Sequence, residues 1–149
     1  MTKITEFSFE IRYTGNPQIG SGVFATHSIE AGAIIPGGIL LPRRSDCRVL
    51  HESDFPSGLK HYTKYCVAKD VDEWYCPWDF ARMENGWRLN HADEHAQDPA
   101  AQPSLRIGPD WELEVVRFIA ADDEVRCDYN QFGEPIRRRK PYYYKGVVD

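Results

Sequence analysis

The sequence predicts a mostly β domain in which several small sheets are joined by turns and few short helices. Two observations carry this prediction. The apolar residues fall into short stretches bounded by Gly, Pro, Asn and Asp, and almost no stretch repeats them with the helical period. The 149 residues, 17.2 kDa, suit one domain with a single core. Hydrophobic residues at 42% and charged residues at 28% exclude a disordered chain, a collagen or a coiled coil.

The elements follow from local patterns. The expected strands are, in chain order, residues 7–12, 23–26, 33–35, 74–76, 104–107, 111–119 and 124–129. Residues 7–12 alternate apolar and polar side chains, the period of a half-buried strand. The apolar run after the third strand resumes at 39–41, beyond a Pro-Gly-Gly break. A short helix is expected over 59–66, and 120–123 form the turn between the last two strands.

The charge excludes some partners and favours others. Eighteen Lys and Arg against 23 Asp and Glu give a net charge of −5, which argues against direct nucleic-acid binding. The acidic surplus favours a basic, Lys-rich protein or peptide. No apolar run approaches the roughly 18 residues that span a bilayer, and the first residues lack a signal-peptide pattern. We therefore expect a cytoplasmic protein, nuclear in a eukaryote, without membrane contact.

Candidate metal ligands are few. The four cysteines are Cys47, Cys66, Cys76 and Cys127. They form no C-x-x-C pair, so we expect no zinc–thiolate site and four reduced thiols. His91 and His95 are four residues apart and could share a metal on a helix, but the H-E-x-x-H pattern is absent. A polar loop held by hydrogen bonds to the backbone is the alternative.

Two further patterns leave alternatives open. Residues 20–25 match G-x-G-x-x-[GA], but a turn precedes them and extended structure follows, so a dinucleotide-binding fold is not expected. The glycines then serve either a hairpin turn or a close approach of the backbone to a ligand. Tyr129, at the end of the last expected strand, is either a packing residue or a reactive hydroxyl.

Three segments in this order resemble the SET domain, the fold of protein-lysine methyltransferases. Residues 20–35 are similar to its G-x-G-V-F-A and I-x-x-G-x-x-I motif, residues 88–104 to R-F-x-N-H-S-x-x-P-N, and residues 115–130 to the I-x-x-G-E-E-L-x-Y-D-Y ending. The resemblance spans 5–131 and implies a SET-domain (β-clip) fold with a threaded C-terminal segment. The tail, 132–149, is then expected to pack over the cofactor site.

The resemblance implies methyl transfer from S-adenosylmethionine to the side-chain amine of a protein lysine. It assigns cofactor binding to Ser21, Gly22, Arg88, Asn90, His91 and Tyr129. Tyr129 matches the catalytic tyrosine, and Cys127 with Tyr129 would line the substrate channel. Phe132 or a tyrosine of 142–144 would stack on the adenine, unless these tyrosines are exposed tail residues. No metal is implied.

Several departures from the family pattern allow other functions. Trp87 occupies the position of the family's arginine, and Arg88 follows one position later. Ser104 replaces an asparagine of the second motif, and Cys127 replaces the first aromatic residue of Y-D-Y. The cysteine clusters that often flank the domain are missing from this sequence. A catalytically weak SET-like module that binds a protein or the cofactor is therefore an alternative. An unrelated small β domain with hydrolase activity at His91 or His95 is another.

Overall fold

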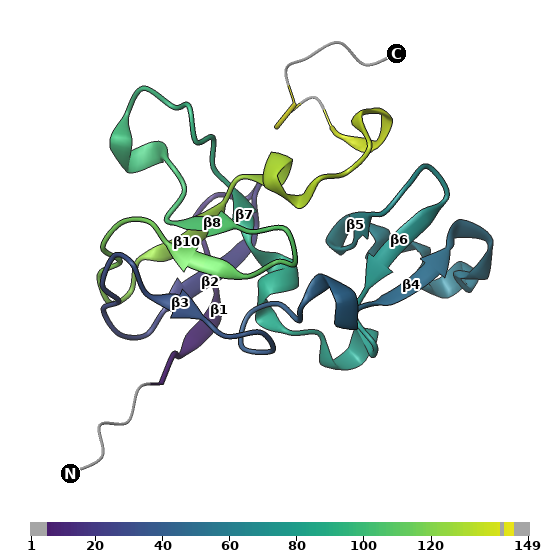
Figure 1. Ribbon diagram of the computed structural model, residues 1–149, viewed down its shortest axis with the longest axis horizontal. Coiled ribbons are helices and arrows are strands. Elements are labelled where there is room, and N and C mark those ends of the chain that lie inside the picture. The colour runs from purple at the N-terminus through teal and green to yellow at the C-terminus, as the bar shows by residue number, and fades with distance from the viewer. Residues whose placement is uncertain (1–5, 141, 145–149) are drawn as a thin grey trace.

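The computed structural model describes residues 6–140 and 142–144, and it arranges them as two β-sheets linked by 3-10 helical turns (Figure 1). The larger sheet has the order β1-β2-β10-β8-β9-β3, with β7 also paired to β10. Its strands are β1 (Phe9–Tyr13), β2 (Ser21–Ala25), β3 (Ile34–Ile35), β7 (Asn90–His91), β8 (Leu105–Ile107), β9 (Leu113–Val115) and β10 (Glu124–Cys127). The smaller sheet, in the order β4-β6-β5, contains β4 (Arg48–His51), β5 (Val67–Ala68) and β6 (Glu73–Cys76). The prediction of a mostly β fold is confirmed.

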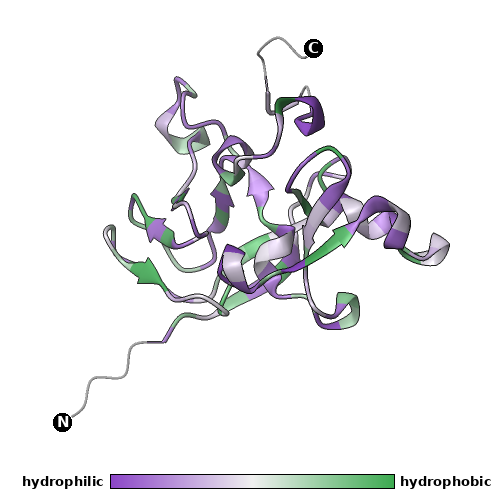
Figure 2. Ribbon diagram, turned by 45° about the vertical axis from the view of Figure 1, so that its right-hand side comes forward, coloured by the Kyte–Doolittle hydropathy of each residue, from purple (hydrophilic) through white to green (hydrophobic). Residues whose placement is uncertain are grey.

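The helical segments of the described residues are short and of the 3-10 type. They are η1 (Arg44–Asp46), η2 (Glu52–Asp54), η3 (Ser57–Tyr65), η4 (Phe80–Arg82), η5 (Asn85–Arg88), η6 (Pro99–Ala101), η7 (Tyr129–Phe132) and η8 (Ile136–Arg138). None of them is long and apolar enough to cross a membrane. Figure 2 shows hydrophilic and hydrophobic residues interspersed along the ribbon.

The glycine-containing segment forms the second half of a β-hairpin. Strands β1 and β2 pair antiparallel, with Phe9 opposite Ala25 and Tyr13 opposite Ser21. Gly20 closes the turn with φ +82°, a conformation that L side chains rarely adopt, and its carbonyl accepts the Thr14 amide at 2.9 Å. Of the two roles considered for the glycines, Gly20 therefore serves the hairpin turn.

Strand β10 joins the parts of the larger sheet. It pairs antiparallel with β2, where Val125 lies opposite Val23. It pairs parallel with β7, where Arg126 lies opposite Asn90, and with β8. Because β2, β7 and β10 carry the three segments of the predicted site, this pairing brings segments distant in the sequence together.

The core fills the space between these strands and the turns around them. Its fully buried side chains include Val23, Leu40, Leu41, Leu105, Leu113, Val115, Ile119, Val125 and Cys127. The Trp87 and Trp111 rings meet edge to face at 5.7 Å, so Trp87 is a packing residue. A separate buried cluster of Phe55, Cys66 and Cys76 lies under the smaller sheet.

Two predicted strands are shorter in the structure than in the sequence analysis. The strand expected over 124–129 ends at Cys127, because the Asp128 carboxylate accepts the Asn130 amide at 2.9 Å and starts η7 at Tyr129. The strand expected over 111–119 is reduced to β9, because Trp111 adopts φ +64° and the chain leaves the ladder after Val115.

Other local expectations also changed. Residues 39–41 form a turn rather than a strand, although Leu40 and Leu41 are buried. The helix expected over 59–66 is present as η3, and strands β4, β5 and β7 were not predicted. The last three are two to four residues long and depend on their partners in the sheet.

Candidate active site

Tyr129 is held at both ends by the segment that contains Leu89 and His91. Its hydroxyl donates to the Leu89 carbonyl at 2.6 Å, and its backbone N–H donates to Nδ1 of His91 at 3.0 Å. Burial raises the pKa of Tyr129 above its ordinary value. The phenol therefore stays protonated at neutral pH, and it can act as a neutral hydrogen-bond donor but not as a phenolate base.

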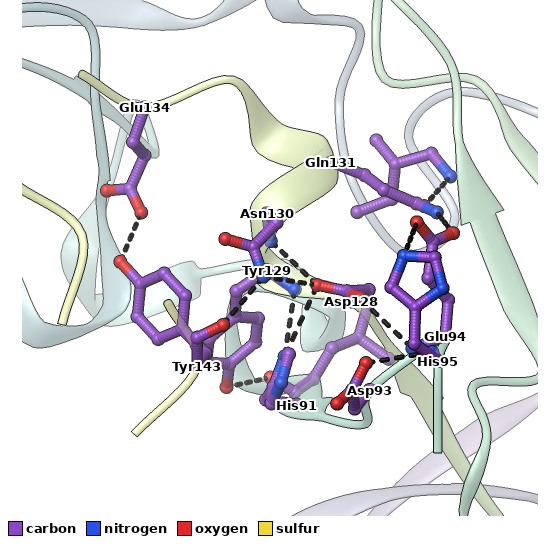
Figure 3. Close-up of polar contacts among 12 residues, drawn as sticks. His91, Asp93, Glu94, His95, Asp128, Tyr129, Asn130, Gln131, Glu134 and Tyr143 are labelled. Atoms are coloured by element: carbon purple, nitrogen blue, oxygen red, sulfur yellow. Dashed lines mark hydrogen bonds and ion pairs between the residues drawn. The ribbon is translucent and has the colours of Figure 1, made fainter. Parts of the chain in front are cut away.

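His91 is held in its neutral form. Nδ1 accepts the Tyr129 amide, so this nitrogen carries no proton, and it lies 3.7 Å from Oδ1 of Asp128 (Figure 3). Desolvation lowers the pKa of His91 and Arg126 lowers it further, while Asp128 and Asp93 act in the opposite direction. The tilted rings of Tyr129 and Tyr143, 5.1 and 5.7 Å away between centroids, complete its surroundings.

The Asn90 side chain links strand β2, which contains the glycine motif, to strand β10. Its amide nitrogen donates to the Ser21 carbonyl at 3.0 Å and to Oε2 of Glu124 at 2.8 Å. A Cβ at Gly22 would lie 2.5 Å from that oxygen and 2.7 Å from the Asn90 nitrogen. Only glycine therefore fits at this position without displacing Asn90.

Asp128 organises the polar loop that follows His91. Only 3% of the residue is exposed, and its carboxylate accepts the amides of Glu94 at 3.1 Å and Asn130 at 2.9 Å (Figure 3). His95 pairs with Glu94 at 3.3 Å on the surface, away from His91. Within the described part of the chain, no three His, Cys, Asp or Glu residues are grouped as metal ligands.

The C-terminal segment is anchored beside Tyr129. The Glu134 carboxylate accepts the Ala68 amide of β5 at 2.9 Å and the Tyr143 hydroxyl at 2.7 Å. The Asn130 side chain donates to the Tyr143 carbonyl at 2.7 Å. The rings of Tyr142 and Tyr143 meet Tyr129 edge to face at 6.2 and 5.3 Å. Of the predicted tail, residues 141 and 145–149 lie outside the described residues.

A cavity of about 280 Å³ separates the C-terminal segment from the smaller sheet. In Figure 1 this segment, in yellow, runs along the top of the molecule from the end of β10 toward β5 and β6. The aromatic residues that line the cavity are Tyr65, Trp74, Trp87, Tyr129, Phe132, Tyr142 and Tyr143. Glu52 and Glu134 add carboxylates. Lys64, Arg138 and Lys140 also line the cavity, and Arg138 pairs with Glu52 at 3.2 Å, so the aromatic rings, and not the net charge of the wall, favour a cationic, elongated side chain.

The structure brings most predicted site residues into two adjoining groups. Ser21, Gly22 and Asn90 form one group, and His91 with Tyr129 forms the other. Arg88 lies over the Tyr65 ring, 5.5 Å from its centroid. Of the residues predicted for catalysis, cofactor contacts or the channel, only Tyr129 lines the cavity. Phe132, Tyr142 and Tyr143, named as candidates to stack on the adenine, also line it, and that stacking stays a prediction. Tyr129 therefore lies between the cavity and the Asn-His segment.

Cys127 is completely buried and does not line this cavity. It pairs through the backbone with His91 and Leu105. The strand expected over 124–129 would have put Cys127 and Tyr129, two residues apart, on the same face, but the observed strand ends between them. The role of Cys127 in a substrate channel stays a prediction.

Sequence reasoning missed the carboxylates that support this site. Glu124 holds Asn90 and matches the second Glu of the G-E-E-L pattern, but the resemblance assigned it no role. Glu134 holds the C-terminal segment and lies outside the three motifs. The partners of Glu134 lie 66 and 9 residues away, so no local pattern indicates them. Leu89 was missed because its contribution is a backbone carbonyl.

Acidification is expected to destabilise the protein through His91. Because the folded-state pKa of His91 lies below 6.5, the unfolded chain binds a proton more readily. The free energy of unfolding should therefore fall as the pH drops below about 6.5, and this contribution should level off below the folded-state pKa. Urea unfolding between about pH 8 and pH 5 measures the effect.

The variant His91→Asn keeps a neutral acceptor near the position of Nδ1 and should flatten that pH dependence. The matched control is His95→Asn, because His95 is exposed, with 84% of its side chain accessible. It should retain the wild-type profile. Identical profiles for all three proteins would show that His91 does not titrate as its surroundings indicate.

Glu134→Gln is expected to destabilise the protein by about 1–3 kcal/mol. A neutral amide offers one acceptor oxygen, so either the Ala68 amide or the Tyr143 hydroxyl loses its partner in a buried position. Thermal unfolding of Glu134→Gln, Tyr143→Phe and the double variant measures the coupling between the two side chains. Strictly additive losses would mean that the Glu134–Tyr143 bond contributes nothing to stability.

Comparisons with known proteins agree with this geometry. The SET domain family model matches residues 20–130. A comparison with curated proteins found no match. The crystal structure of KRYPTONITE in complex with mCHH DNA, H3(1-15) peptide and SAH is similar, with a TM-score of 0.52 and 16% identity over 99% of this chain and 27% of that chain. This likeness concerns the fold.

Two further structures are less similar, with TM-scores of 0.48 and 16% identity. One is a candidate histone methyltransferase of Plasmodium falciparum, aligned over 83% of this chain and 93% of that chain. The other is a humanized mutant of the Chaetomium thermophilum Polycomb Repressive Complex 2 bound to the inhibitor GSK126, over 82% of this chain and 15% of that chain. The family assignment rests instead on the model match, which covers well over half of the sequence and includes Ser21, Asn90 and Tyr129. The protein belongs to the SET domain family.

Proposed function

We propose that the protein transfers a methyl group from S-adenosylmethionine to the side-chain amine of a lysine in a protein or peptide. The observation that supports this most directly is the position of Tyr129. Its neutral hydroxyl lies between the aromatic cavity and the Asn-His segment, held by Leu89 and His91. Methyl transfer needs an aligned, deprotonated amine and exclusion of water.

The groups around Asn90 fit the polar part of the cofactor. Both bonds made by the Asn90 amide nitrogen go to protein oxygens, so its carbonyl oxygen is the atom left to accept from an ammonium. Ser21 is exposed beside it, and the buried Gly22 leaves room for the Asn90 and Glu124 side chains. Arg88 supplies a cation for a carboxylate. S-Adenosylmethionine, when bound, supplies a methyl group on a sulfonium.

The cavity is the proposed place for the substrate lysine. Aromatic rings surround it, and their faces attract a cationic ammonium group. Burial against these rings also lowers the pKa of a lysine amine, which favours the neutral form that reacts. The wall carries Glu52 and Glu134 but also Lys64, Arg138 and Lys140, so attraction by the aromatic rings, and not a net negative charge, supports this placement.

Tyr129 is the proposed catalytic residue at the inner end of this cavity. Its hydroxyl stays protonated because burial raises its pKa, so it orients its neighbours without taking the proton of the amine. The Leu89 carbonyl and the His91 ring fix its orientation from opposite ends. Because its proton is donated to the Leu89 carbonyl, the hydroxyl oxygen can accept a hydrogen bond from the amine. A preorganised neutral dipole of this kind contributes through the field it presents at the transition state.

The experiment that tests this function has two parts. Calorimetry with S-adenosylhomocysteine, the demethylated product, measures binding, and mass spectrometry of lysine peptides measures methyl transfer. Binding together with turnover supports the enzyme. Binding without turnover on any peptide of a broad library would indicate the alternative function, a cofactor-binding module. The observation that favours this alternative is the buried Trp87 at the family's arginine position. Absence of binding would remove the cofactor assignment.

Methylation of basic peptides is expected to slow as salt increases. Asp122, Asp123 and the loop residues Glu94 and Asp98 are exposed, and the net charge is −5. Opposite charges accelerate encounter more than they add affinity, and salt screens them. Between about 50 and 300 mM salt, kcat/KM should fall several-fold for a peptide with Lys and Arg neighbours. The same target lysine with neutral neighbours is the control, and equal salt dependence for both peptides would contradict electrostatic selection.

A further inference from the structure

We propose that Cys66 and Cys76 form a redox-active dithiol, which mild oxidation by a peroxide converts into a reversible intrachain disulfide on the wall of the aromatic cavity. The cross-link itself does not depend on the proposed methyl transfer. Only its effect on substrate binding rests on that function.

Strand register places the two cysteines opposite each other. In the β5–β6 pair, Val67 lies opposite Tyr75 and Ala68 opposite Trp74. One step further along this antiparallel ladder, Cys66 faces Cys76. Residues opposite each other in such a pair have Cα atoms about 4.5–5.5 Å apart, within the roughly 4.4–6.8 Å that a disulfide spans. Both residues also belong to one buried cluster.

Contacts between the thiols agree with this register. The Cys66 thiol has two acceptors within reach, the Tyr62 carbonyl at 3.4 Å and the Cys76 sulfur. The hydrogen bond between the two thiols raises the pKa of Cys66, as does its burial, and lowers the pKa of Cys76. Arg48 lowers the pKa of Cys76 further, while burial opposes this. Arg48 lies directly opposite Cys76 on the other side of β6. Within the described residues, its buried Nε has no hydrogen-bond partner.

Only one of the two thiols can be reached by a small oxidant. Cys66 is 8% exposed and lines the cavity, whereas Cys76 is completely buried and does not line it. Cys66 is therefore the attacking thiol and Cys76 the resolving one. The other two cysteines, Cys47 and Cys127, are also buried and form no disulfide, and neither lines this cavity.

The chemistry balances with hydrogen peroxide as the oxidant. Because its pKa is raised, Cys66 reacts through a thiolate that is its minor form. This thiolate attacks one peroxide oxygen, the O–O bond breaks, and hydroxide leaves and takes up the thiol proton as water. The Cys76 thiolate then attacks the sulfur of the resulting sulfenic acid and expels a second hydroxide, which takes up the proton of Cys76. Two thiols and one peroxide give one disulfide and two waters. Each sulfur loses one electron, and the peroxide oxygens gain two.

The disulfide would change the cavity wall. In the sequence, Cys66 lies between Tyr65 and strand β5. Arg88 packs on the Tyr65 ring, and the Ala68 amide of β5 donates to Glu134. A covalent link from Cys66 to β6 would draw the Cys66 sulfur toward β6 and fix this part of the wall. The cross-link also closes a short loop, which restricts the unfolded chain and stabilises the folded protein.

Peptide mapping of the full chain tests the proposal. The protein is treated with stoichiometric hydrogen peroxide, denatured in excess N-ethylmaleimide and digested without reduction. We expect a linked pair of peptides containing Cys66 and Cys76, alkylated Cys47 and Cys127, and full recovery of four thiols after dithiothreitol. Four alkylated thiols, a different linked pair, or only sulfinic acid at Cys66 would overturn the proposal.

Three variants provide the controls. Cys66→Ala and Cys76→Ala should each lose the cross-link, while Cys47→Ala should form it as the wild type does. Oxidation should raise the unfolding midpoint of the wild type and of Cys47→Ala by about 5 °C or more. It should leave the Cys66→Ala midpoint unchanged. A rise in Cys66→Ala equal to that of the wild type would also contradict the assignment.

Discussion

Replacing Tyr129 with phenylalanine is expected to lower methyl transfer to a lysine peptide by about 10²–10³-fold, the loss typical of one preorganised donor. The ring contacts with His91 and Tyr143 remain in this variant. Only the hydroxyl, which lies 2.6 Å from the Leu89 carbonyl, is removed. The cost in folding stability should stay near 1 kcal/mol, that of one ordinary hydrogen bond. Initial rates and thermal unfolding on the same preparations separate the two effects.

The matched control is Tyr142→Phe. Tyr142 lines the same cavity and packs against Tyr129, but it is 64% exposed. Its hydroxyl is therefore not part of the arrangement that holds Tyr129, and this variant should keep most of the rate. Wild-type turnover in Tyr129→Phe would remove Tyr129 from the catalytic role. An equal loss in both variants would point to the aromatic wall as a whole.

Gly86→Ala is expected to cause the largest loss of stability, about 2–4 kcal/mol, or a fall of roughly 5–15 °C in the unfolding midpoint. Gly86 is buried in η5, and its amide donates to the Leu40 carbonyl at 2.8 Å. A Cβ at this position would collide with the carbon and oxygen of that carbonyl, and it would lie 2.9 Å from Cγ of Leu41. Because the obstacle is backbone, a rotamer change cannot relieve the contact. Denaturant unfolding measures the loss.

The chain offers a control for this substitution in Gly58. It also lies in a 3-10 helix, η3, but a Cβ there would meet nothing within 4 Å. Gly58→Ala should therefore change stability by no more than about 0.5 kcal/mol. Equal losses of stability at the two positions would mean that the conformational entropy of glycine in the unfolded chain, and not the contact with Leu40, determines the change. Gly86 also lines the aromatic cavity, so the damaged variant should bind substrate more weakly.

Local patterns in the sequence were sufficient for much of the fold. The alternation in 7–12, the alternating Leu-Arg-Ile of 105–107 and the turn at 120–123 each predicted an element that is present in β1, β8 and the connection to β10. These segments carry their own hydrophobic period and are bounded by turn residues. The order of three motifs was enough to indicate the SET domain family, and the match over 20–130 confirms it.

The sequence also determined candidate residues, but not how they meet. Ser21 and Asn90 were named from separate motifs, and their contact exists only because β2, β7 and β10 share one sheet. Asp128, which was expected to continue a strand, instead caps η7 and turns the chain at Tyr129. A hydrogen bond from one side chain to the backbone outweighed the local strand pattern there.

Tertiary structure alone decided the surroundings of the site. The bond between Tyr129 and Leu89 spans 40 residues, and the one between Glu134 and Ala68 spans 66. The pairing of Cys66 with Cys76 depends on the register of β5, a two-residue strand without a period of its own. Sequence patterns report which face of a segment is buried, whereas these contacts depend on which segments pack together. That choice is made by the summed burial of the whole core, and no short stretch of the sequence contains it.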